Sequence, residues 1–530
     1  MKRGLFQTVL ILFAVASLFV AGFVAAAEKP APKATPAATA PKVAAKATPS
    51  AQPQLGGILK IIEVTGPKTP FGWPVESVGE STVAHKPIIE SLVRLHYNGR
   101  IEPWLAESWK VAPDKKSVTF VLRKGVKFHD GTDFNAEAAK FNLDALKAGK
   151  NPGTEDWGSI DIIDAYTVRI NLLKYSNILL SRFGGTPGSM VSPTAFKTKG
   201  IEWARWNPVG TGPFEFVSFE RDASMRYKKF YGYWQKGKPY LDGLQYVYIK
   251  DPMTQAATIE AGEAHVLNTE TGKMAADLKA MGLNVYPADT GVVVLIPDSM
   301  NTDSPLANKK VREAVDYSID KEAIVKAKGY GFWQAAYQLP TTGSMAYQKN
   351  LQGRKYDPAK AKKLLAEAGY PKGFKTRIIP HFAVDRDVMV SIQSYLSKVG
   401  ITVDLEFVDQ GKFTEYRRKG WKNGFLCQPL GEFPNYLQSI EYYFAPTTLE
   451  FPSLKKPAEL GALLNDALLT INPELPKIYK ALKTLSDDIT VVPIHTTGRA
   501  CISQKNVHDT GHLTLGNWGW WTSEKAWMSK

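Results

Sequence analysis

FKTRIIPHFAVDRDVMVSIQSYLSKVGITVDLEFVD, residues 374–409, is the stretch of sequence that decides the fold class. It begins and ends with apolar, β-branched runs, Thr376–Pro380 and Ile401–Val408, which are typical of strands. Between the two runs, apolar side chains recur at the spacing of one buried helix face: Ile392, Tyr395, Leu396 and Val399. A strand, a helix and a second strand in this order form a parallel unit, so we expect a mixed or parallel sheet and not a β-sandwich.

The same alternation continues from Gly56 to the end of the chain, without the fixed period of a solenoid or a propeller. Six further apolar runs predict strands: Gly57–Val64, Val118–Arg123, Tyr166–Leu173, Phe214–Glu220, Leu244–Lys250 and Val292–Ile296. Amphipathic patterns predict three further helices: Ala136–Ala148 behind the cap Asn135, Asn308–Ala327, and Asp357–Ala368. An α/β protein is therefore expected.

Length and composition limit the class of protein. A chain of 530 residues needs two or three domains, or one large domain of two lobes. With 44% hydrophobic and 22% charged residues, the composition is that of a globular protein. Only one apolar stretch is long enough to cross a membrane, so a polytopic transporter is excluded. The cysteines Cys427 and Cys501 have no zinc-site spacing, and we expect both to be unpaired and buried, with a single disulfide as the alternative.

The net charge of +15 is spread along the chain. Residues 1–54 hold six Lys or Arg and one Glu, a surplus of five, which leaves +10 for residues 55–530. Those charges stand among acidic residues in short clusters, a pattern that indicates a basic solvated surface. No nucleic-acid partner is expected.

The N-terminus has the pattern of a secretory signal peptide over residues 1–27. Lys2 and Arg3 precede an apolar run, Leu10–Val24, and three alanines form a cleavage site before Glu28. The alternative is an uncleaved anchor over Leu5–Ala27. Residues 28–54 are an Ala/Pro/Lys-rich linker that cannot bury a core. Either way the rest of the chain is exported, to a periplasm or to the cell surface, with an N-terminal tether as one outcome.

A search for catalytic motifs finds no GxSxG, HExxH or complete GxGxxG sequence. The segment Gly232–Lys238 resembles a phosphate loop, but Pro239 replaces the hydroxyl residue that would bind Mg²⁺. His508 and His512 have the spacing of a helical metal pair, yet the residues between them predict a turn. We therefore expect no enzyme, no cofactor and no metal site.

Tryptophan is concentrated at the C-terminus. Four of the thirteen tryptophans lie in the last thirteen residues: Trp518, Trp520, Trp521 and Trp527. Aromatic side chains on loops form rigid walls for ligands, and they also fix a terminal segment to a core. Both interpretations stay open.

Several blocks, taken in order, resemble one known family. LVRLHYNGRIEPWLAESWKVAPDKKSVTFVLRKGVKFHDGTDFNAEAAKFNLDAL (92–146) resembles the most recognisable stretch of the family 5 extracytoplasmic solute-binding proteins of ABC importers, the dipeptide, oligopeptide and nickel-binding group. The resemblance continues through five further blocks: 207–219, 230–234, 301–325, 356–370 and 392–407. It covers nearly the whole chain from Gly56 onward.

The resemblance implies a two-lobed α/β periplasmic-binding-protein fold of type II, similar to the large cluster C proteins, in which hinge strands connect the lobes. It places lobe I at 55–298 and 490–530, with an extra subdomain at about 84–204, and lobe II at 299–489. The implied function is capture of a peptide-like solute in the interlobe cleft by a monomer, and its delivery to the permease subunits of an ABC transporter. An oligosaccharide or a metal chelate is the alternative solute, and a secreted enzyme or a chaperone-like binder on this fold is the alternative class.

The ligand itself is less well indicated. Peptide-binding relatives commonly carry an aspartate that binds the α-ammonium group of the ligand, in a stretch matched here by GFLCQPLGEFPNYLQSI (424–440). At that position this sequence has Pro429 or Gln428, neither of which is a carboxylate, although Glu432 is near. We predict ligand contacts from lobe II, from the C-terminal tail and from a strand end: Gln428, Glu432, Asn435 and Tyr436, then Trp518, Trp520 and Trp521, and His381.

Overall fold

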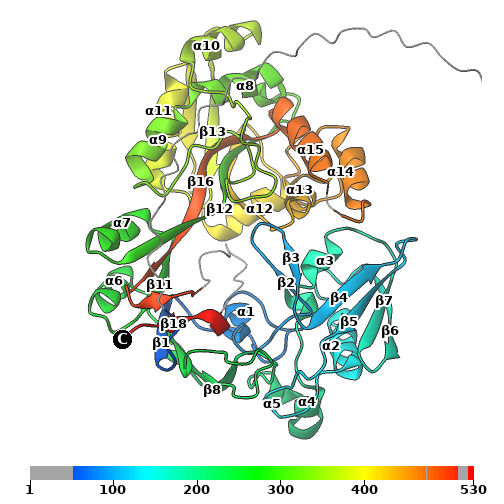
Figure 1. The fold of residues 1–530 in the computed structure, drawn as a ribbon. Helices are drawn as coiled ribbons and strands as arrows, with labels where there is room; N and C mark the ends of the chain where they lie inside the picture. The colour runs from blue at the N-terminus through cyan, green and yellow to red at the C-terminus, as the bar shows by residue number, and fades with distance from the viewer. Residues whose placement is uncertain (1–51, 473, 511–522) are drawn as a thin grey trace, which may run out of the picture. The chain divides into compact units, whose positions relative to one another are not determined.

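Two long strands, β12 (Asn284–Pro297) and β16 (Val492–Ser503), pair antiparallel along most of their length and organise the computed structural model (Figure 1). The structure describes residues 52–472, 474–510 and 523–530, and Pro53–Lys530 forms one compact unit. The predicted signal peptide and most of the linker lie outside the described residues. Among the described residues, no helix has the length and apolar character that a membrane crossing requires.

The central sheet has ten strands and is mixed, as the pattern of residues 374–409 predicts. Its strands follow in the order β14 (Ile401–Leu405), β13 (Phe374–Pro380), β15 (Gly424–Gly431), β12, β16, β11 (Val266–Thr269), β1 (Ile58–Glu63), β10 (Gly243–Tyr248), β9 (Ser224–Lys229) and β8 (Phe214–Glu220). Parallel pairing joins β13 to β14 and β15, and joins β1 to β10 and β11. The predicted unit is confirmed as β13, α11 (Arg386–Ser397) and β14, with Phe374 paired to Ile401.

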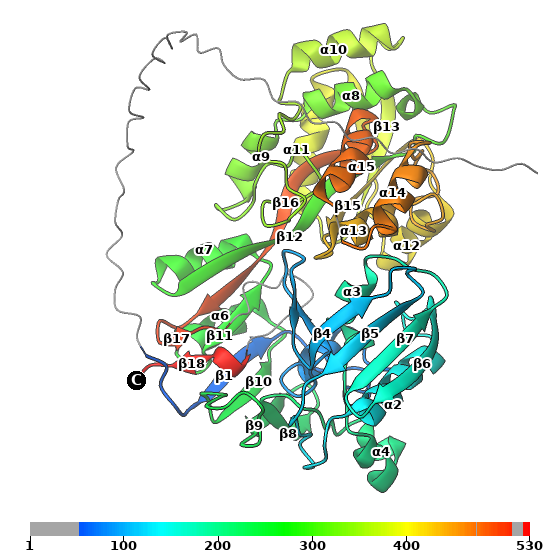
Figure 2. The ribbon, with the colours of Figure 1, turned by 45° about the vertical axis from the view of Figure 1, so that its right-hand side comes forward.

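The sheet continues through two lobes, because β12 and β16 belong to both (Figure 2). We call lobe II the part in which β12 pairs with β15, and lobe I the part in which β16 pairs with β11. No single residue of these long strands separates the lobes, so the predicted boundaries at 298/299 and 489/490, and the subdomain at about 84–204, stay predictions.

Helices cover both faces of the sheet in lobe II. They are η2 (Pro305–Ala307), α8 (Lys309–Ser318), α9 (Lys321–Lys328), α10 (Pro358–Glu367), α11, α12 (Gln410–Lys419), α13 (Tyr436–Phe444), α14 (Leu460–Leu468) and α15 (Leu475–Asp487). Alternate residues of β12 enter opposite cores: Val292, Val294 and Ile296 pack with α13 to α15, whereas Val293 and Leu295 pack with α8 to α11. A strand buried on both faces gives the continuous apolar run seen in its sequence.

Lobe I contains the remaining elements. Beside its part of the large sheet lie α1 (Glu80–His85), α6 (Pro252–Glu260), α7 (Gly272–Ala280), α4 (Pro193–Lys199) and α5 (Ile201–Ala204), with β17 (Val507–His508), η4 (Ser523–Lys525) and β18 (Trp527–Met528) near the C-terminus. A separate four-stranded sheet, β4 (Ala106–Val111), β5 (Ser117–Leu122), β7 (Thr167–Leu172) and β6 (Trp157–Asp164), packs with α2 (Ala136–Ala148), the hairpin β2 (Val93–Leu95)–β3 (Ile101–Pro103), α3 (Leu179–Arg182) and η1 (Thr186–Gly188). This sheet has its own core around Phe120, Phe128 and Phe134.

Local capping explains where the predicted helices agree and differ. The Asn135 side chain accepts a hydrogen bond from the Ala138 amide, and α2 begins as predicted. The single helix predicted over Asn308–Ala327 is wrong: the chain is extended at Ile319, and Asp320 caps the new helix α9. Cys427 and Cys501 are free and buried, which confirms the preferred prediction.

Candidate functional site

Parallel strands end together at two places beside the central strands β12 and β16. In lobe I, β1 and its parallel neighbours β10 and β11 end together; in lobe II, β13 and its neighbours β14 and β15 do so. Ligands of open α/β sheets bind outside the carboxyl ends of such strands. The polar side chains that these strand ends bring to β12 and β16 are therefore the candidates for a ligand site.

A group of polar residues, which we call the hinge cluster, joins β12, β16, the end of β15 and the loop 337–354. Its members are Asp289, Thr290, Thr341, Thr342, Glu432, Thr496 and Thr497. The Thr341 amide donates to Glu432 Oε2 at 2.9 Å, and Thr342 Oγ1 donates to Asp289 Oδ2 at 3.2 Å. The Glu432 amide donates to the Thr290 carbonyl at 3.1 Å. These bonds hold two carboxylates where β12 and β16 pass between the lobes.

Both carboxylates of the hinge cluster have a raised pKa. Burial raises the pKa of Glu432 to about 7, and the charge of Asp289 raises it further. Hydrogen bonds from Ser344 and Thr341 act in the opposite direction. Burial also raises the pKa of Asp289, although Thr496 and Thr342 donate to it. A cation or a donor-rich group would favour the charged form of each. The hinge cluster is thus suited to bind an ammonium group.

Lobe I adds further charges next to this cluster. Arg499 pairs across the ladder with Ala288, the neighbour of Asp289, and its Nε donates to Glu270 Oε1 at 2.8 Å. Glu63 stands at the end of β1, where burial raises its pKa to about 7 against the opposing effects of Arg499 and Asn268. Four carboxylates and one guanidinium of the described residues therefore lie along the strand ends and β12: those of Glu63, Glu270, Asp289, Glu432 and Arg499.

The predicted ligand residues of lobe II fall into two groups. Glu432 belongs to the hinge cluster, and with Tyr436 it lines a cavity of about 10 Å³, room for a single water. Gln428 and Asn435 are 3% and 4% exposed, and Asn435 Oδ1 accepts a hydrogen bond from the Leu437 amide at the start of α13. Their contact with a ligand stays a prediction.

The remaining predicted residues lie apart from the hinge cluster or outside the described residues. His381 follows β13; its amide donates to the Cys427 carbonyl at 2.8 Å, and its ring lies 4.1 Å from that of Phe382. Burial lowers its pKa. Three predicted contacts are not described: Trp518, Trp520 and Trp521. Among the described residues, no group of three or more His, Cys, Asp or Glu side chains could hold a metal ion.

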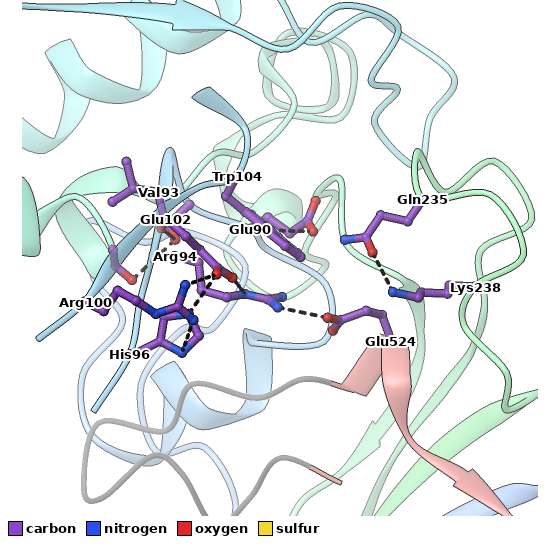
Figure 3. A network of polar contacts seen from close by, with 12 residues as sticks. Glu90, Val93, Arg94, His96, Arg100, Glu102, Trp104, Gln235, Lys238 and Glu524 are labelled. Atoms are coloured by element: carbon purple, nitrogen blue, oxygen red, sulfur yellow. Dashed lines mark hydrogen bonds and ion pairs between the residues drawn. The ribbon is translucent and has the colours of Figure 1, made fainter. Parts of the chain in front are cut away.

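Residue-level reasoning missed Asp289, Thr341 and Thr342, and it also missed a polar network in lobe I (Figure 3). The buried carboxylate of Glu90 accepts four hydrogen bonds, from Trp104 Nε1 (2.8 Å), Tyr233 Oη (2.8 Å), Thr211 Oγ1 (2.8 Å) and Trp234 Nε1 (3.0 Å). Burial raises its pKa to about 7 in spite of these donors. The available signal was a glutamate inside the apolar run PIIESLVRL.

The same network fixes the base of the hairpin β2–β3. Arg94 of β2 lies 3.3 Å from the ring centroid of Trp104 and donates to Glu524 Oε1 at 3.0 Å (Figure 3). At the hairpin turn the chain passes so close to lobe II that a Cβ on Gly99 would stand 2.6 Å from the Pro434 carbonyl oxygen. The network therefore positions a contact between the lobes near Glu432.

The segment 175–178 of lobe I makes a second contact, with the end of α14 in lobe II. The Asn177 amide and Nδ2 donate to the carbonyls of Leu468 (2.9 Å) and Ala467 (2.8 Å), and Tyr175 Oη donates to that of Ile471 (3.0 Å). The last carbonyls of a helix have no hydrogen-bond donor inside the helix, and here lobe I supplies donors to them.

Comparison with known proteins identifies the family. The model of the bacterial extracellular solute-binding proteins, family 5, matches residues 100–448. The glutathione-binding protein GsiB of Salmonella choleraesuis is 34% identical over 358 residues, which cover 64% of this chain and 68% of that protein.

Two solved structures show the same two-lobed architecture. HbpA2 from Haemophilus parasuis is 22% identical and superposes with a TM-score of 0.80 over 89% of this chain and 100% of its own. A dipeptide-binding protein from Pseudoalteromonas in complex with Met-Leu is 25% identical, with a TM-score of 0.69 over 89% of this chain and 100% of its own. The predicted α/β fold is confirmed, and this chain belongs to the family 5 bacterial extracellular solute-binding proteins.

Proposed function

We propose that this chain, as the substrate-binding protein of an ABC importer, captures a peptide-like solute between its lobes and delivers it to the permease subunits. The observation that carries the choice of solute is the pair of carboxylates in the hinge cluster, Asp289 and Glu432, each with a raised pKa. An α-ammonium group would compensate both charges with charge-assisted hydrogen bonds. Glu432 would then perform the role of the aspartate that this sequence lacks.

Relatives support a solute of this class. The names of related proteins include binders of glutathione and of a dipeptide, both of which carry an α-ammonium group. The family also includes a protein solved with Fe(III)-EDTA, so a chelate is the alternative that an experiment must distinguish. Export by the predicted signal segment, to a periplasm or to the cell surface, belongs to the same proposal, and so does the absence of catalysis.

The test is native mass spectrometry of the gently purified protein. A discrete excess mass that is lost on denaturation, and that fragments as a peptide, would agree with the proposal; a sugar or a chelate would contradict it. If no solute copurifies, a thermal-shift screen over the three classes follows, since a bound ligand raises stability by RT ln(1 + [L]/Kd).

The role of Glu432 is tested with the same ligand. We expect Glu432→Gln to weaken binding about tenfold or more, because it removes a charge-assisted hydrogen bond of about 1.5–3 kcal/mol. The matched control is Glu415→Gln, an exposed glutamate of α12 in the same lobe that pairs with Lys412. Equal affinities of the two variants would exclude Glu432 from the site.

A further inference from the structure

Lobe II contains a second cavity, of about 250 Å³, between α15, α8, the start of β16 and the loop 337–354. Protein interiors pack closely and contain few voids larger than a water molecule. An engineered apolar cavity of about 150 Å³ holds benzene, so this cavity has room for about ten non-hydrogen atoms. It is large enough to bind a small organic molecule.

About half of the residues that line the cavity are apolar. They include Leu339, Leu351, Leu482, Leu485, Val491 and Pro493. Leu482 and Leu485 of α15 are 6% and 2% exposed, whereas Leu351 is 38% exposed and Lys483 lies at the solvent side with its side chain 71% exposed. The cavity thus has a buried apolar floor on α15 and an accessible mouth. Burial of an apolar ring on such a floor is favourable.

One charge in this cavity lacks a complete set of partners. Among the described residues that line it, Lys483 pairs with Asp487, and Asp316 receives the buried ammonium of Lys321 at 2.7 Å. Arg354 uses one N–H on Asp316 at 3.4 Å and one on the Ser486 carbonyl at 3.0 Å. Three of the five guanidinium N–H groups have no partner in the part of the chain that the structure describes. A carboxylate is the group whose shape and charge match them.

We propose that lobe II has a second ligand site, separate from the hinge cluster, for a small apolar carboxylate bound by Arg354. The ring or alkyl chain of the ligand lies against Leu482 and Leu485, and its carboxylate receives the free N–H groups of Arg354. The loop 337–354 forms one wall of this site and also provides Thr341 and Thr342 to the hinge cluster. Occupancy therefore stabilises the loop in the conformation that bonds Glu432.

The test titrates the full chain with phenylacetate in a calorimeter. We expect one saturable site with a dissociation constant of about 10–500 µM, a range that is modest for about ten non-hydrogen atoms. The matched probe is 2-phenylethanol, which has the same apolar body and no charge, and it should bind at least about tenfold more weakly because it lacks the carboxylate that Arg354 would bind. Absence of binding by phenylacetate, or equal binding of both probes, would overturn the proposal.

Variants and hydrogen exchange locate the site. Arg354→Met should weaken phenylacetate binding at least about tenfold, since it removes a charged hydrogen-bond donor, and Lys321 still pairs with Asp316 in this variant. Leu485→Trp fills the cavity and should abolish binding, while Arg386→Met, an exposed arginine of α11, should leave it unchanged. In the unmodified chain, phenylacetate should slow amide exchange in residues 337–354 and not in residues 84–104. Binding that survives both cavity variants, or slowed exchange only outside lobe II, would contradict the proposed site.

Discussion

The buried carboxylate of Glu90 fixes the positions of several side chains in lobe I. Its two carboxylate oxygens accept four hydrogen bonds, two each, from donors on three segments of lobe I. A buried donor that loses its acceptor costs about 1–3 kcal/mol. The glutamate therefore holds Trp104, Trp234, Tyr233 and Thr211 in one arrangement, which supports the hairpin that contacts lobe II.

We expect Glu90→Ala to lower the free energy of unfolding by about 3–5 kcal/mol, and Glu90→Gln by about 2–3 kcal/mol, because the amide nitrogen of glutamine faces two donors. Urea unfolding of the full chain measures both. The control Glu107→Gln changes a glutamate whose side chain is 50% exposed, and it should stay within about 0.5 kcal/mol of the unmodified protein. A Glu90→Ala variant as stable as this control would show that the network contributes little.

Elements with local signals could be predicted from the sequence, and elements set by distant partners could not. The caps Asn135 and Asp357 mark α2 and α10, and both helices begin where they were expected. The apolar pattern of β12 predicts only Val292–Ile296, because the polar Asp289 and Thr290 interrupt it where the strand crosses between the lobes. Pairing with β16, about 200 residues away in the chain, extends this strand to fourteen residues.

The same distinction applies to the candidate site. Glu432 was predicted from its place in a family motif, whereas Asp289 and Thr342 give no local signal of chemistry. The sheet places β12 beside β15 and β16, which brings Asp289 near Glu432, and the loop that follows the bridge from Ala335 to His495 adds Thr342. Three-dimensional topology, and not spacing along the chain, assembles the hinge cluster.

The contact between segment 175–178 and α14 makes a prediction at the scale of elements. Asn177→Ala removes the 2.8 Å bond to the Ala467 carbonyl, which then keeps the longer bond of 3.3 Å from the Thr470 amide. We expect amide exchange in peptides 173–180 and 464–472 to increase about tenfold, since a lost hydrogen bond of about 1.4 kcal/mol changes local opening by that factor. The control Asn171→Ala acts in the same subdomain, where its amide bonds Ser159 and Asp161 within lobe I. Unchanged exchange in both peptides of the Asn177→Ala variant would mean that the contact does not restrain the lobes.

The described residues join the lobes at the hinge strands and at further contacts, which include the hairpin turn near Pro434, the segment 175–178 on α14, and Phe332 of lobe II against the core of lobe I. An opening that pivots on β12 and β16 would separate the hairpin turn and the segment 175–178 from lobe II. The energy of these contacts is therefore part of the free-energy difference between open and closed states, and it contributes to ligand affinity without touching the ligand.

Buried titratable groups of opposite kinds predict an optimum of stability in pH. Burial lowers the pKa of His85 to about 3 and that of His129 to about 4, so the unfolded chain binds more protons, and stability rises with pH up to about 6.5. Burial raises the pKa of Glu63, Glu90 and Glu432 to about 7, so the folded chain binds more protons between pH 4.5 and 7, and stability falls with pH in that window. The two effects oppose each other below about pH 6.5. Above that pH, only the glutamates change the stability.

We therefore expect the melting temperature of the full chain to be highest near pH 5 and to decrease by a few degrees toward pH 8, because the three glutamates with a raised pKa outnumber the two histidines with a lowered pKa. Glu432→Gln should reduce the decrease on the alkaline side, because its side chain cannot ionise, while Glu107→Gln should retain it in full. Scanning calorimetry in buffers of constant ionic strength measures all three proteins. A melting temperature that continues to increase up to pH 8, or an alkaline decrease that is the same in Glu432→Gln, would show that Glu432 is ionised in the folded protein well below pH 7.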